Sequence, residues 1–226
     1  MMTVMSQAPL FRLFKLRLKD SEKAAFAKVG KQNLLTSIQQ ETGTLAMYTG
    51  HLDEAGVEHR VLELYRDQAS YEIHAKSLQF QTFKTVAGQA VVDQSVMSLT
   101  PLLLLEQGPA LRTLAPTKQV VVLTELMAQP SATADMQVLV KSAIRRAITT
   151  EPSLVTAYFG QVTAEPQKFV LFEVFQDDEA YQQHQQTNDF KAFKQASQSL
   201  ITQATTTMIK PDVSVTQGQL TFENQS

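Results

Sequence analysis

The amino-acid sequence predicts an α+β fold in which two β-α-β-β-α-β repeats pack sheet to sheet. Three observations lead to this prediction. A shift of 110 positions aligns the two halves of the 226-residue chain without a gap, and each half has the same order of strand and helix patterns. The run 169–175 is apolar on both alternating faces, so the strand that it predicts needs a cover on each side.

The internal repeat is clearest in the chemically distinctive residues. The shift pairs Glu41 with Glu151, Tyr48 with Tyr158, Glu63 with Glu173, Asp67 with Asp177, Tyr71 with Tyr181, His74 with His184, Phe80 with Phe190 and Phe83 with Phe193. Between the halves, residues 108–117 contain two Pro residues and little periodicity, which is typical of a connector. We therefore expect one repeat over residues 1–110 and a second over residues 111–226.

Each repeat is predicted to contain four main strands. Runs rich in β-branched, aromatic and other apolar residues, bounded by turn residues, indicate these strands. They cover residues 11–18, 45–51, 60–65 and 96–99 in the first repeat, and 120–126, 155–162, 169–175 and 207–209 in the second. A Pro follows each last strand, and the short apolar runs beyond it, 102–105 and 213–215, are expected to reach a neighbouring sheet.

Helices are predicted between these strands. Apolar residues at helical spacing predict the first helix of each repeat; they are Phe26, Val29, Leu34 and Ile38, and Met136, Leu139, Val140, Ala143, Ala147 and Ile148. Asp67 can cap a second helix, in which Tyr71 and His74 lie one turn apart on the same face. A further helix begins at Phe80, and the second repeat has the same residue types at all four positions.

Composition narrows the classes of function. Lys and Arg number 20 against 22 for Asp and Glu, so the charge gives no reason to expect a nucleic acid or an anionic membrane as partner. The absence of Cys excludes thiolate metal sites, iron–sulfur clusters and a Cys nucleophile. His51 and His59 flank a hairpin, but no further ligand stands at a metal-binding spacing. With no phosphate loop or dinucleotide motif either, we expect neither a metal nor a cofactor.

The sequence also gives an expectation for location. Its N-terminal stretch, residues 1–17, has basic residues inside the apolar run and lacks the order of a secretory signal. The longest apolar run, 102–105, is far shorter than the ~20 residues that span a bilayer. We therefore expect a cytoplasmic protein.

Equivalent segments of the two repeats resemble a family signature. Each has a Glu in a strand, an aromatic residue two positions on, a capping Asp, a His in the following helix and a Phe-rich helix start. These residues are Glu63, Tyr65, Asp67, His74, Phe80 and Phe83, and Glu173, Phe175, Asp177, His184, Phe190 and Phe193. The pattern is similar to that of the antibiotic biosynthesis monooxygenase family of dimeric α+β barrels. The resemblance covers nearly all of both repeats and implies two ferredoxin-like units fused into a pseudo-dimeric α+β barrel.

The resemblance also implies a chemistry. The family includes cofactor-independent monooxygenases, in which a deprotonated quinol or phenol itself reduces oxygen. Such an enzyme needs an apolar pocket that excludes water, a base poised near neutral pH and hydrogen-bond donors. The haem-degrading branch has a Trp where this chain has His74 and a ligating His where it has Lys84, so the resemblance does not extend to haem. We therefore expect a cofactor-independent monooxygenase acting on a small quinol or hydroxylated aromatic.

The candidate site residues follow from this expectation. His74 is the predicted base, because the pKa of His suits that role, and Glu63 and Tyr71 are the other catalytic candidates. The predicted substrate-binding residues are Tyr48, Arg12, Tyr65, Phe80 and Phe83, and the equivalents in the second repeat are His184, Glu173, Tyr181 and Tyr158. The second repeat has Val170 in place of Arg60 and Phe169 in place of His59. If only one pocket works, we therefore expect it to be that of the first repeat.

Two other functions agree with the same residues. A module that only binds a hydrophobic small molecule, or only assembles, needs the pocket but no base. An isomerase of a small carbonyl compound would use His74 to move protons and Arg12 and Arg60 to bind a charged substrate. In each case the His could also be structural, and a Glu in an apolar strand is costly to bury without a partner. The expected partners are a small-molecule substrate and, as a possibility, a second copy of the tandem chain.

Overall fold

The computed structural model describes residues 3–5 and 7–224, so the outermost positions of the two predicted repeats lie outside it. The strands are β1 (Thr3–Val4), β2 (Leu10–Leu18), β3 (Thr44–His51), β4 (Glu58–Tyr65), β5 (Val91–Glu106), β6 (Arg112–Leu114), β7 (Val120–Ala128), β8 (Leu154–Val162), β9 (Lys168–Phe175), β10 (Ile201–Thr216) and β11 (Leu220–Glu223). The helices are α1 (Lys23–Gln40), α2 (Gln68–Lys76), α3 (Leu78–Ala90), α4 (Thr133–Thr150), α5 (Asp178–Gln186) and α6 (Asn188–Ser197). Short 3₁₀ turns at Asp20–Glu22 and Pro130–Ala132 precede α1 and α4.

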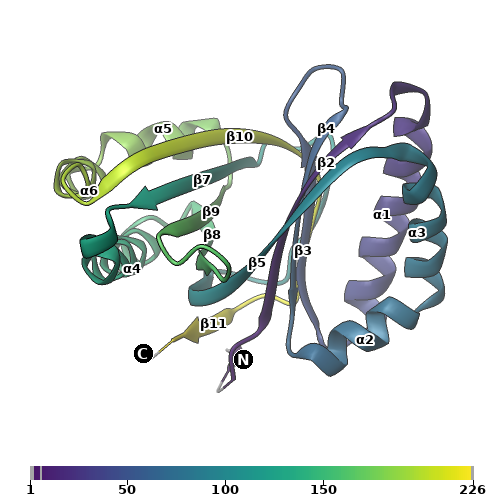
Figure 1. Cartoon of the computed structure of the whole chain (residues 1–226), viewed down its shortest axis with the longest axis horizontal. Helices are drawn as coiled ribbons and strands as arrows, with labels where there is room; N and C mark the ends of the chain where they lie inside the picture. The colour runs from purple at the N-terminus through teal and green to yellow at the C-terminus, as the bar shows by residue number, and fades with distance from the viewer. Residues whose placement is uncertain (1–2, 6, 225–226) are drawn as a thin grey trace.

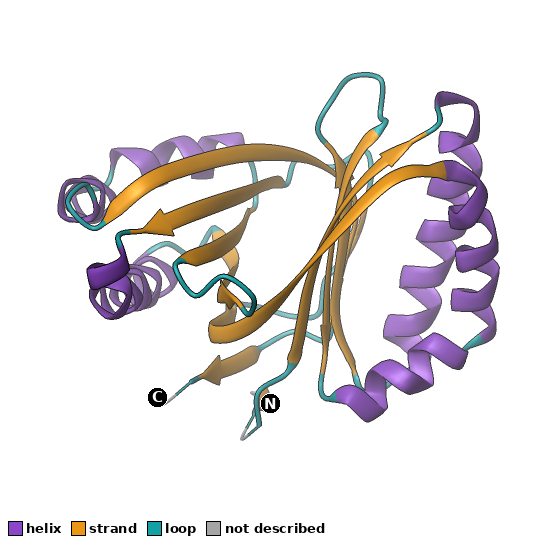
Figure 2. Cartoon of the chain, in the orientation of Figure 1, coloured by secondary structure: helices purple, strands orange, loops and turns teal. Residues whose placement is uncertain are grey.

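Eight strands form a closed antiparallel barrel. Their order is β5, β2, β4, β3, β10, β7, β9 and β8, and β8 pairs back onto β5. Each half of that order is the strand order of a split β-α-β unit. Helices α1, α2 and α3 cover the outer face of the first sheet, and α4, α5 and α6 cover the second (Figure 1). The layers are therefore helix, sheet, sheet and helix (Figure 2), which confirms the predicted α+β fold.

The last strand of each repeat belongs to both sheets. In β5, residues 91–99 pair with β2 of the same repeat, and residues 99–106 pair with β8 of the other. In β10, the two parts pair with β7 and then with β3. The register shifts just after Pro101 and just after Pro211, where the strand bends without the amide hydrogen that Pro lacks. The expectation that the runs beyond each Pro reach a neighbouring sheet is confirmed, and this crossing joins two stacked sheets into a barrel.

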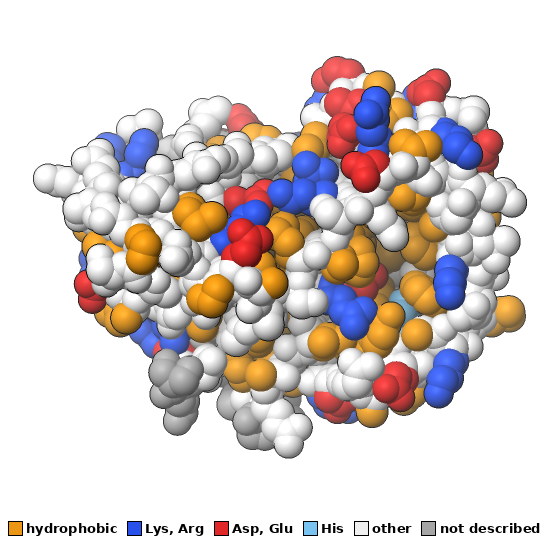
Figure 3. Space-filling model, in the orientation of Figure 1, with side chains coloured by type: hydrophobic (Ala, Val, Ile, Leu, Met, Phe, Trp, Pro, Cys, Tyr) orange, Lys and Arg blue, Asp and Glu red, His pale blue; other side chains and the backbone are white. Residues whose placement is uncertain are grey.

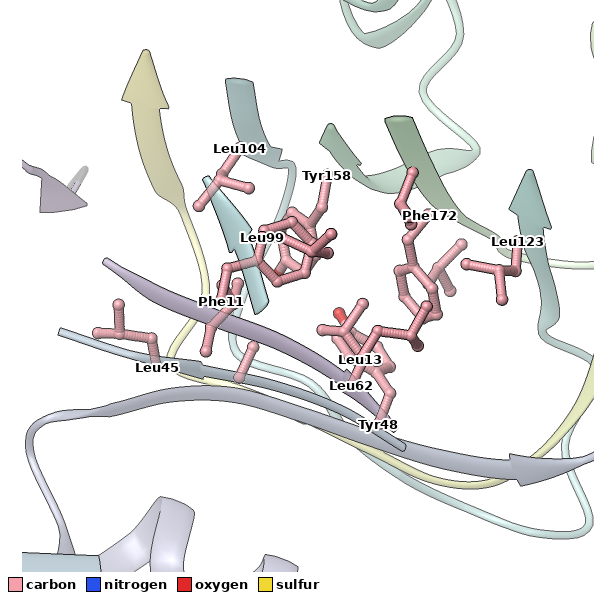
Figure 4. Close-up of a cluster of buried hydrophobic side chains, with 14 of the residues drawn as sticks. Phe11, Leu13, Leu45, Tyr48, Leu62, Leu99, Leu104, Leu123, Tyr158 and Phe172 are labelled. Atoms are coloured by element: carbon pink, nitrogen blue, oxygen red, sulfur yellow. The ribbon is translucent and has the colours of Figure 1, made fainter. Parts of the chain in front are cut away.

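The inner faces of the two sheets enclose one apolar core. Figure 4 shows ten labelled members of this core: Phe11, Leu13, Leu45, Tyr48, Leu62, Leu99, Leu104, Leu123, Tyr158 and Phe172. Alternate side chains on each strand point away from the barrel, toward the helices. On β9, Val170, Phe172 and Val174 lie in the barrel core, whereas Phe169, Leu171 and Phe175 belong to the cluster under the second set of helices. Both faces of β9 are thus covered, as its sequence predicted.

The surface charges reflect the nearly equal numbers of acidic and basic residues. Acidic and basic side chains are interspersed on the face shown in Figure 3. Within the described part of the chain, no helix combines the length and apolar character needed to cross a membrane.

Candidate active site

In each repeat, two successive helix caps position a His and a Phe of the candidate site. The Asp67 carboxylate accepts a hydrogen bond from the backbone N–H of Ser70 at 2.7 Å and starts α2. The hydroxyl oxygen of Ser77 then accepts from the N–H of Phe80 at 3.4 Å and starts α3. The two caps place the rings of His74 and Phe80 4.7 Å apart, and Asp177 and Thr187 produce the same spacing in the second repeat.

His74 ties α2 to the end of α1. Its side chain is fully buried, and its Nδ1 lies 3.0 Å from Oε2 of Glu41. Burial alone would raise the pKa of the Glu41 carboxyl, but the hydrogen bonds of His74 and Thr44 outweigh it and hold that pKa below its usual value. The Gln79 side chain also donates to Glu41, at 2.7 Å. His74 is therefore tied to Glu41 through Nδ1, whereas its buried Nε2 has no hydrogen-bond partner among the described residues.

The other predicted residues of the first repeat pack around this cluster. Glu63 is 9% exposed; burial raises the pKa of its carboxyl, while His74 and Arg12 act to lower it. The Arg12 guanidinium carbon lies 3.9 Å from the centre of the Tyr71 ring, a cation–π contact. The remaining aromatic neighbours are Tyr65, 5.3 Å from the His74 ring, and Phe83, which packs against Phe26 at 5.3 Å.

Open space is scarce in the first repeat at this point. The cavity beside Glu63 has a volume of only about 30 Å³, and Asn33, His59 and Asp212 line it but His74 does not. His74 therefore does not line this cavity, and its role as a base facing an apolar pocket stays a prediction. Arg12 stacks on Tyr71, and Phe80 lies 6.3 Å from Phe83 between their ring centres.

Tyr48 and Tyr158 lie on the opposite face of the sheet, inside the barrel (Figure 4). The Tyr48 hydroxyl is 3.1 Å from Oγ1 of Thr156, and the Tyr158 hydroxyl donates to Glu106. Strand β3 pairs Tyr48 with Leu62, one residue before Glu63, so alternation sends Tyr48 and Glu63 to opposite faces. This corrects the expectation that Tyr48 and its equivalent Tyr158 line the same pocket as the buried carboxyls.

A much larger cavity lies in the second repeat, between its sheet and helices α5 and α6. Its volume is about 330 Å³, at the lower end of the range for small-molecule sites. Its lining is mainly apolar and includes three of the predicted residues, Glu173, Tyr181 and His184, together with Phe190 and Phe193. Val122 and Thr124 line it where the first repeat has Arg12 and Phe14. This cavity lies in the second repeat, whereas the sequence led us to expect the working pocket in the first repeat if only one works.

Glu173 is the most perturbed acid beside this cavity. Burial raises the pKa of its carboxyl to about 7; His184 opposes the rise and Glu151 adds to it. Glu173 is 9% exposed, the same as Glu63, so the neighbours account for the difference between the two. Phe175 replaces Tyr65, which removes a hydroxyl group that lowers the pKa of Glu63, and Val122 replaces Arg12, which removes the cation that lowers it further.

His184 is held on the same cavity wall by a second carboxylate. Its Nδ1 lies 2.8 Å from Oε2 of Glu151, at the C-terminal end of α4. A buried carboxyl with a pKa near 7 beside an oriented imidazole is an arrangement suited to proton transfer. Glu151 was not among the predicted site residues, although its alignment with Glu41 in the internal repeat was a signal for it. Across the described residues, no three His, Cys, Asp or Glu side chains are grouped closely enough to hold a metal ion.

Comparisons with known proteins agree with this architecture. The family model of the antibiotic biosynthesis monooxygenases matches residues 119–196, so the resemblance to that family is confirmed over the second repeat. No curated protein matches the chain.

Several solved structures have the same fold. A "putative monooxygenase" from Lactobacillus acidophilus is 21% identical, with a TM-score of 0.86 over 95% of this chain and 99% of its own. Another of that name from Fusobacterium nucleatum is 16% identical, with a TM-score of 0.90 over 97% and 100%. An anthrone oxidase-like protein is 9% identical, with a TM-score of 0.61 over 94% and 95%. At these identities the likeness establishes the fold, including its tandem arrangement in one chain.

Proposed function

We propose that this chain, whose second repeat matches the antibiotic biosynthesis monooxygenases, oxidises a small quinol or hydroxylated aromatic in the cavity of that repeat. The family match supports a general monooxygenase role. The observation on which the proposal rests is the buried Glu173 carboxyl, with a pKa of about 7, on the wall of a mainly apolar cavity of about 330 Å³. A base is most effective when its pKa lies near the working pH.

The proposed reaction draws all its electrons from the substrate. Glu173 takes the proton of a ring hydroxyl, and the resulting phenolate gives electrons to dioxygen. A carbon–oxygen bond forms at a ring carbon, and the hydroperoxide that results loses water to leave a carbonyl group. In total a phenol and one dioxygen give a quinone and one water, so one oxygen atom enters the product. No added reductant is required, in agreement with the cofactor-independent chemistry expected from the sequence.

His184 and the apolar walls supply the rest of the site. The contact with Glu151 at Nδ1 orients the ring, and in its protonated imidazolium form the ring donates a second hydrogen bond, from Nε2, to the oxyanion that develops on the substrate. Walls such as Leu171, Phe190 and Phe193 exclude water and so strengthen these electrostatic interactions. One of the fold relatives is an anthrone oxidase-like protein, which agrees with an aromatic substrate.

The isomerase alternative loses its proposed cations. Arg12 is stacked on Tyr71, and the Arg60 guanidinium donates to the backbone carbonyl of His59 at 2.8 Å. Neither lines the large cavity. A module that only binds a small molecule needs the same cavity but no base, and so remains an outcome of the test below.

The test is oxygen consumption by purified, chelator-treated protein with a panel of quinols and hydroxylated aromatics, followed by mass spectrometry of products formed under ¹⁸O₂. The proposal predicts one ¹⁸O atom in the product and one dioxygen consumed per product molecule. A compound that binds in the cavity but is not oxidised would establish the binding module instead. Consumption of oxygen with release of hydrogen peroxide and no labelled product would contradict the monooxygenase reaction.

A further inference from the structure

One end of the barrel contains a polar cavity that the proposed reaction does not use. Its volume is about 300 Å³. Its polar lining residues come from both repeats: Lys15, Glu125, Lys168, Gln203 and Thr205. None of them lines the cavity beside Glu173. We propose that this second cavity binds a small organic molecule through a carboxylate group.

The alternation of side chains along the strands explains why charges meet at this place. Leu13 in β2 and Leu123 in β7 belong to the barrel core, so Lys15 and Glu125, two residues further on, lie on the same inner faces. The Lys15 ammonium is 2.5 Å from Oε1 of Glu125. Lys168, the first residue of β9, approaches Oε2 of the same carboxylate at 3.3 Å. Two ammonium groups therefore share one carboxylate.

The shared carboxylate leaves positive charge unbalanced in the cavity. The side chains of Lys15, Lys168 and Glu125 are 29%, 23% and 17% exposed, so solvent screens them less than charges on an open surface. Burial acts to raise the pKa of the Glu125 carboxyl, but the two lysines outweigh it and hold that pKa below its usual value. Glu125 is thus ionised at neutral pH, and the excess of one positive charge matches a monocarboxylate.

Uncharged residues supply the rest of a carboxylate site. Gln203 and Thr205 line the cavity from β10, and neither side chain has a hydrogen-bond partner among the described residues. A carboxylate can accept about four hydrogen bonds, so it can use the free amide and hydroxyl donors together with an ammonium group. Leu126 and Met127 also line the cavity and offer contacts to the carbon skeleton of an organic acid.

The first repeat has different charges on its side of the same barrel end. Glu58 stands at the position of Lys168, and Asp93 stands at the position of Gln203. Arg17 contacts Glu58 at 3.6 Å and lies opposite Asp93 in the sheet. Two carboxylates thus surround one guanidinium there, whereas the second repeat presents an ammonium beside a neutral amide. The charges of the second repeat suit an anion, and those of the first repeat do not.

The experiment uses 4-bromobenzoate as the probe with the full-length chain. Calorimetry measures its affinity, and anomalous scattering from soaked crystals locates the bromine, which we expect in the cavity beside Lys168. Lys168→Gln should weaken binding at least about tenfold, because hydrogen bonds to charged groups are among the strong ones. Glu125→Gln should strengthen binding about tenfold, because the ligand then no longer competes with the internal carboxylate or is repelled by it.

The matched control is Lys28→Gln, which removes the same charge from an exposed position of α1 and should leave the affinity within about twofold of wild type. Circular dichroism checks that each variant is folded. An equal loss in Lys28→Gln and Lys168→Gln would overturn the proposal, because net charge alone would then explain the binding. Weaker binding in Glu125→Gln would also overturn it.

The location of the bromine separates this site from the proposed active site. Bromine found only in the cavity beside Glu173 would show that the second cavity is not a carboxylate site. Inorganic phosphate is the comparison ligand: if it binds beside Lys168 and 4-bromobenzoate does not, the assignment to carboxylates is wrong. None of these measurements involves turnover, so the site can be established or rejected whether or not the chain oxidises a quinol.

Discussion

The two repeats bury the same carboxyl in the same place, yet they surround it differently. Glu63 and Glu173 are equally buried, each beside a His held by a second Glu. In the first repeat a cation reaches Glu63 and stacks on Tyr71, and little space is left. In the second repeat Val122 stands at that position and lines a cavity of about 330 Å³, and burial raises the pKa of Glu173 to about 7.

This difference indicates that losing the charged neighbour of a buried carboxyl can turn a structural position into a candidate catalytic site. A cation beside a carboxylate stabilises the charged form and so makes it a weaker base. The long side chain of Arg12 also takes up volume that a substrate would need. A short apolar residue in its place removes both effects at once. The repeat that lacks this cation beside its buried carboxyl is therefore the better candidate for acid–base chemistry.

The first prediction places the cation of the first repeat into the second, which should remove the difference between them. In Val122→Arg the new guanidinium should stack on Tyr181 and fill the large cavity. We expect substrate turnover to fall by at least about 10²-fold, because even small misplacement of a reactant has effects of that size. Steady-state oxygen consumption measures the change.

The matched control for that variant is Val138→Arg, on the exposed face of α4, where the native side chain is 69% exposed. It adds the same charge to the same repeat, and turnover should stay within about twofold of wild type, since exposed substitutions seldom disturb the fold. Equal loss in both variants would mean that charge, not cavity closure, is responsible.

A second prediction separates the two His residues by stability. His74→Ala removes the partner of the buried Glu41 and should lower the free energy of unfolding by about 3 kcal/mol. His184→Ala should cost less, because the Glu151 side chain is 16% exposed, against 7% for Glu41, and water can replace the His. Urea denaturation measures both values. Turnover per folded molecule should be nearly normal in His74→Ala; a fall of more than tenfold would restore the original prediction that His74 is the base.

A third prediction concerns stability and pH. The pKa of Glu173 is about 7 in the folded chain against 4.5 ordinarily, so the folded state holds this proton more tightly than the unfolded state. Stability should therefore fall as pH rises from about 4.5 to 7, and the whole cost is present above that range. Glu173→Gln removes the effect and should stabilise the chain at pH 8 by up to about 3 kcal/mol more than at pH 5.

Thermal or urea unfolding at the two pH values checks this prediction. The equivalent variant Glu63→Gln should show a smaller difference, because His74 and Arg12 lower the pKa of Glu63 and so offset part of its burial. A pH dependence that is equal in the two variants would contradict the account of the cavity electrostatics.

Much of the fold was predictable because local patterns decide it. Alternation in β9 required covers on both faces, and Asp67 and Asp177 cap the helices as expected. The Pro residues before the crossing runs also indicated where each last strand leaves its own sheet. These features depend on neighbours in the sequence, or on the period of the pattern itself.

The site was predicted only in part, because its decisive features are tertiary. Glu173, Tyr181 and His184 were named from the repeat, but the size of their cavity depends on which side chains pack opposite them. The side of the sheet on which Tyr48 lies depends on the register between β3 and β4, which cannot be read from the sequence. Glu151 lies 33 positions before His184, and only the tertiary packing of the second repeat brings them together.

The most direct test of the central claim compares two conservative variants, Glu173→Gln and Glu63→Gln, in the same oxygen-consumption assay. Each removes one buried carboxyl and keeps its shape. If the second repeat holds the working base, Glu173→Gln should lower kcat by about 10²- to 10⁴-fold, the usual contribution of a positioned acid–base group, and Glu63→Gln should leave kcat within about twofold of wild type. A larger loss of kcat in Glu63→Gln, or an equal loss in both variants, would contradict the assignment of a catalytic role to the second repeat and a structural role to the first.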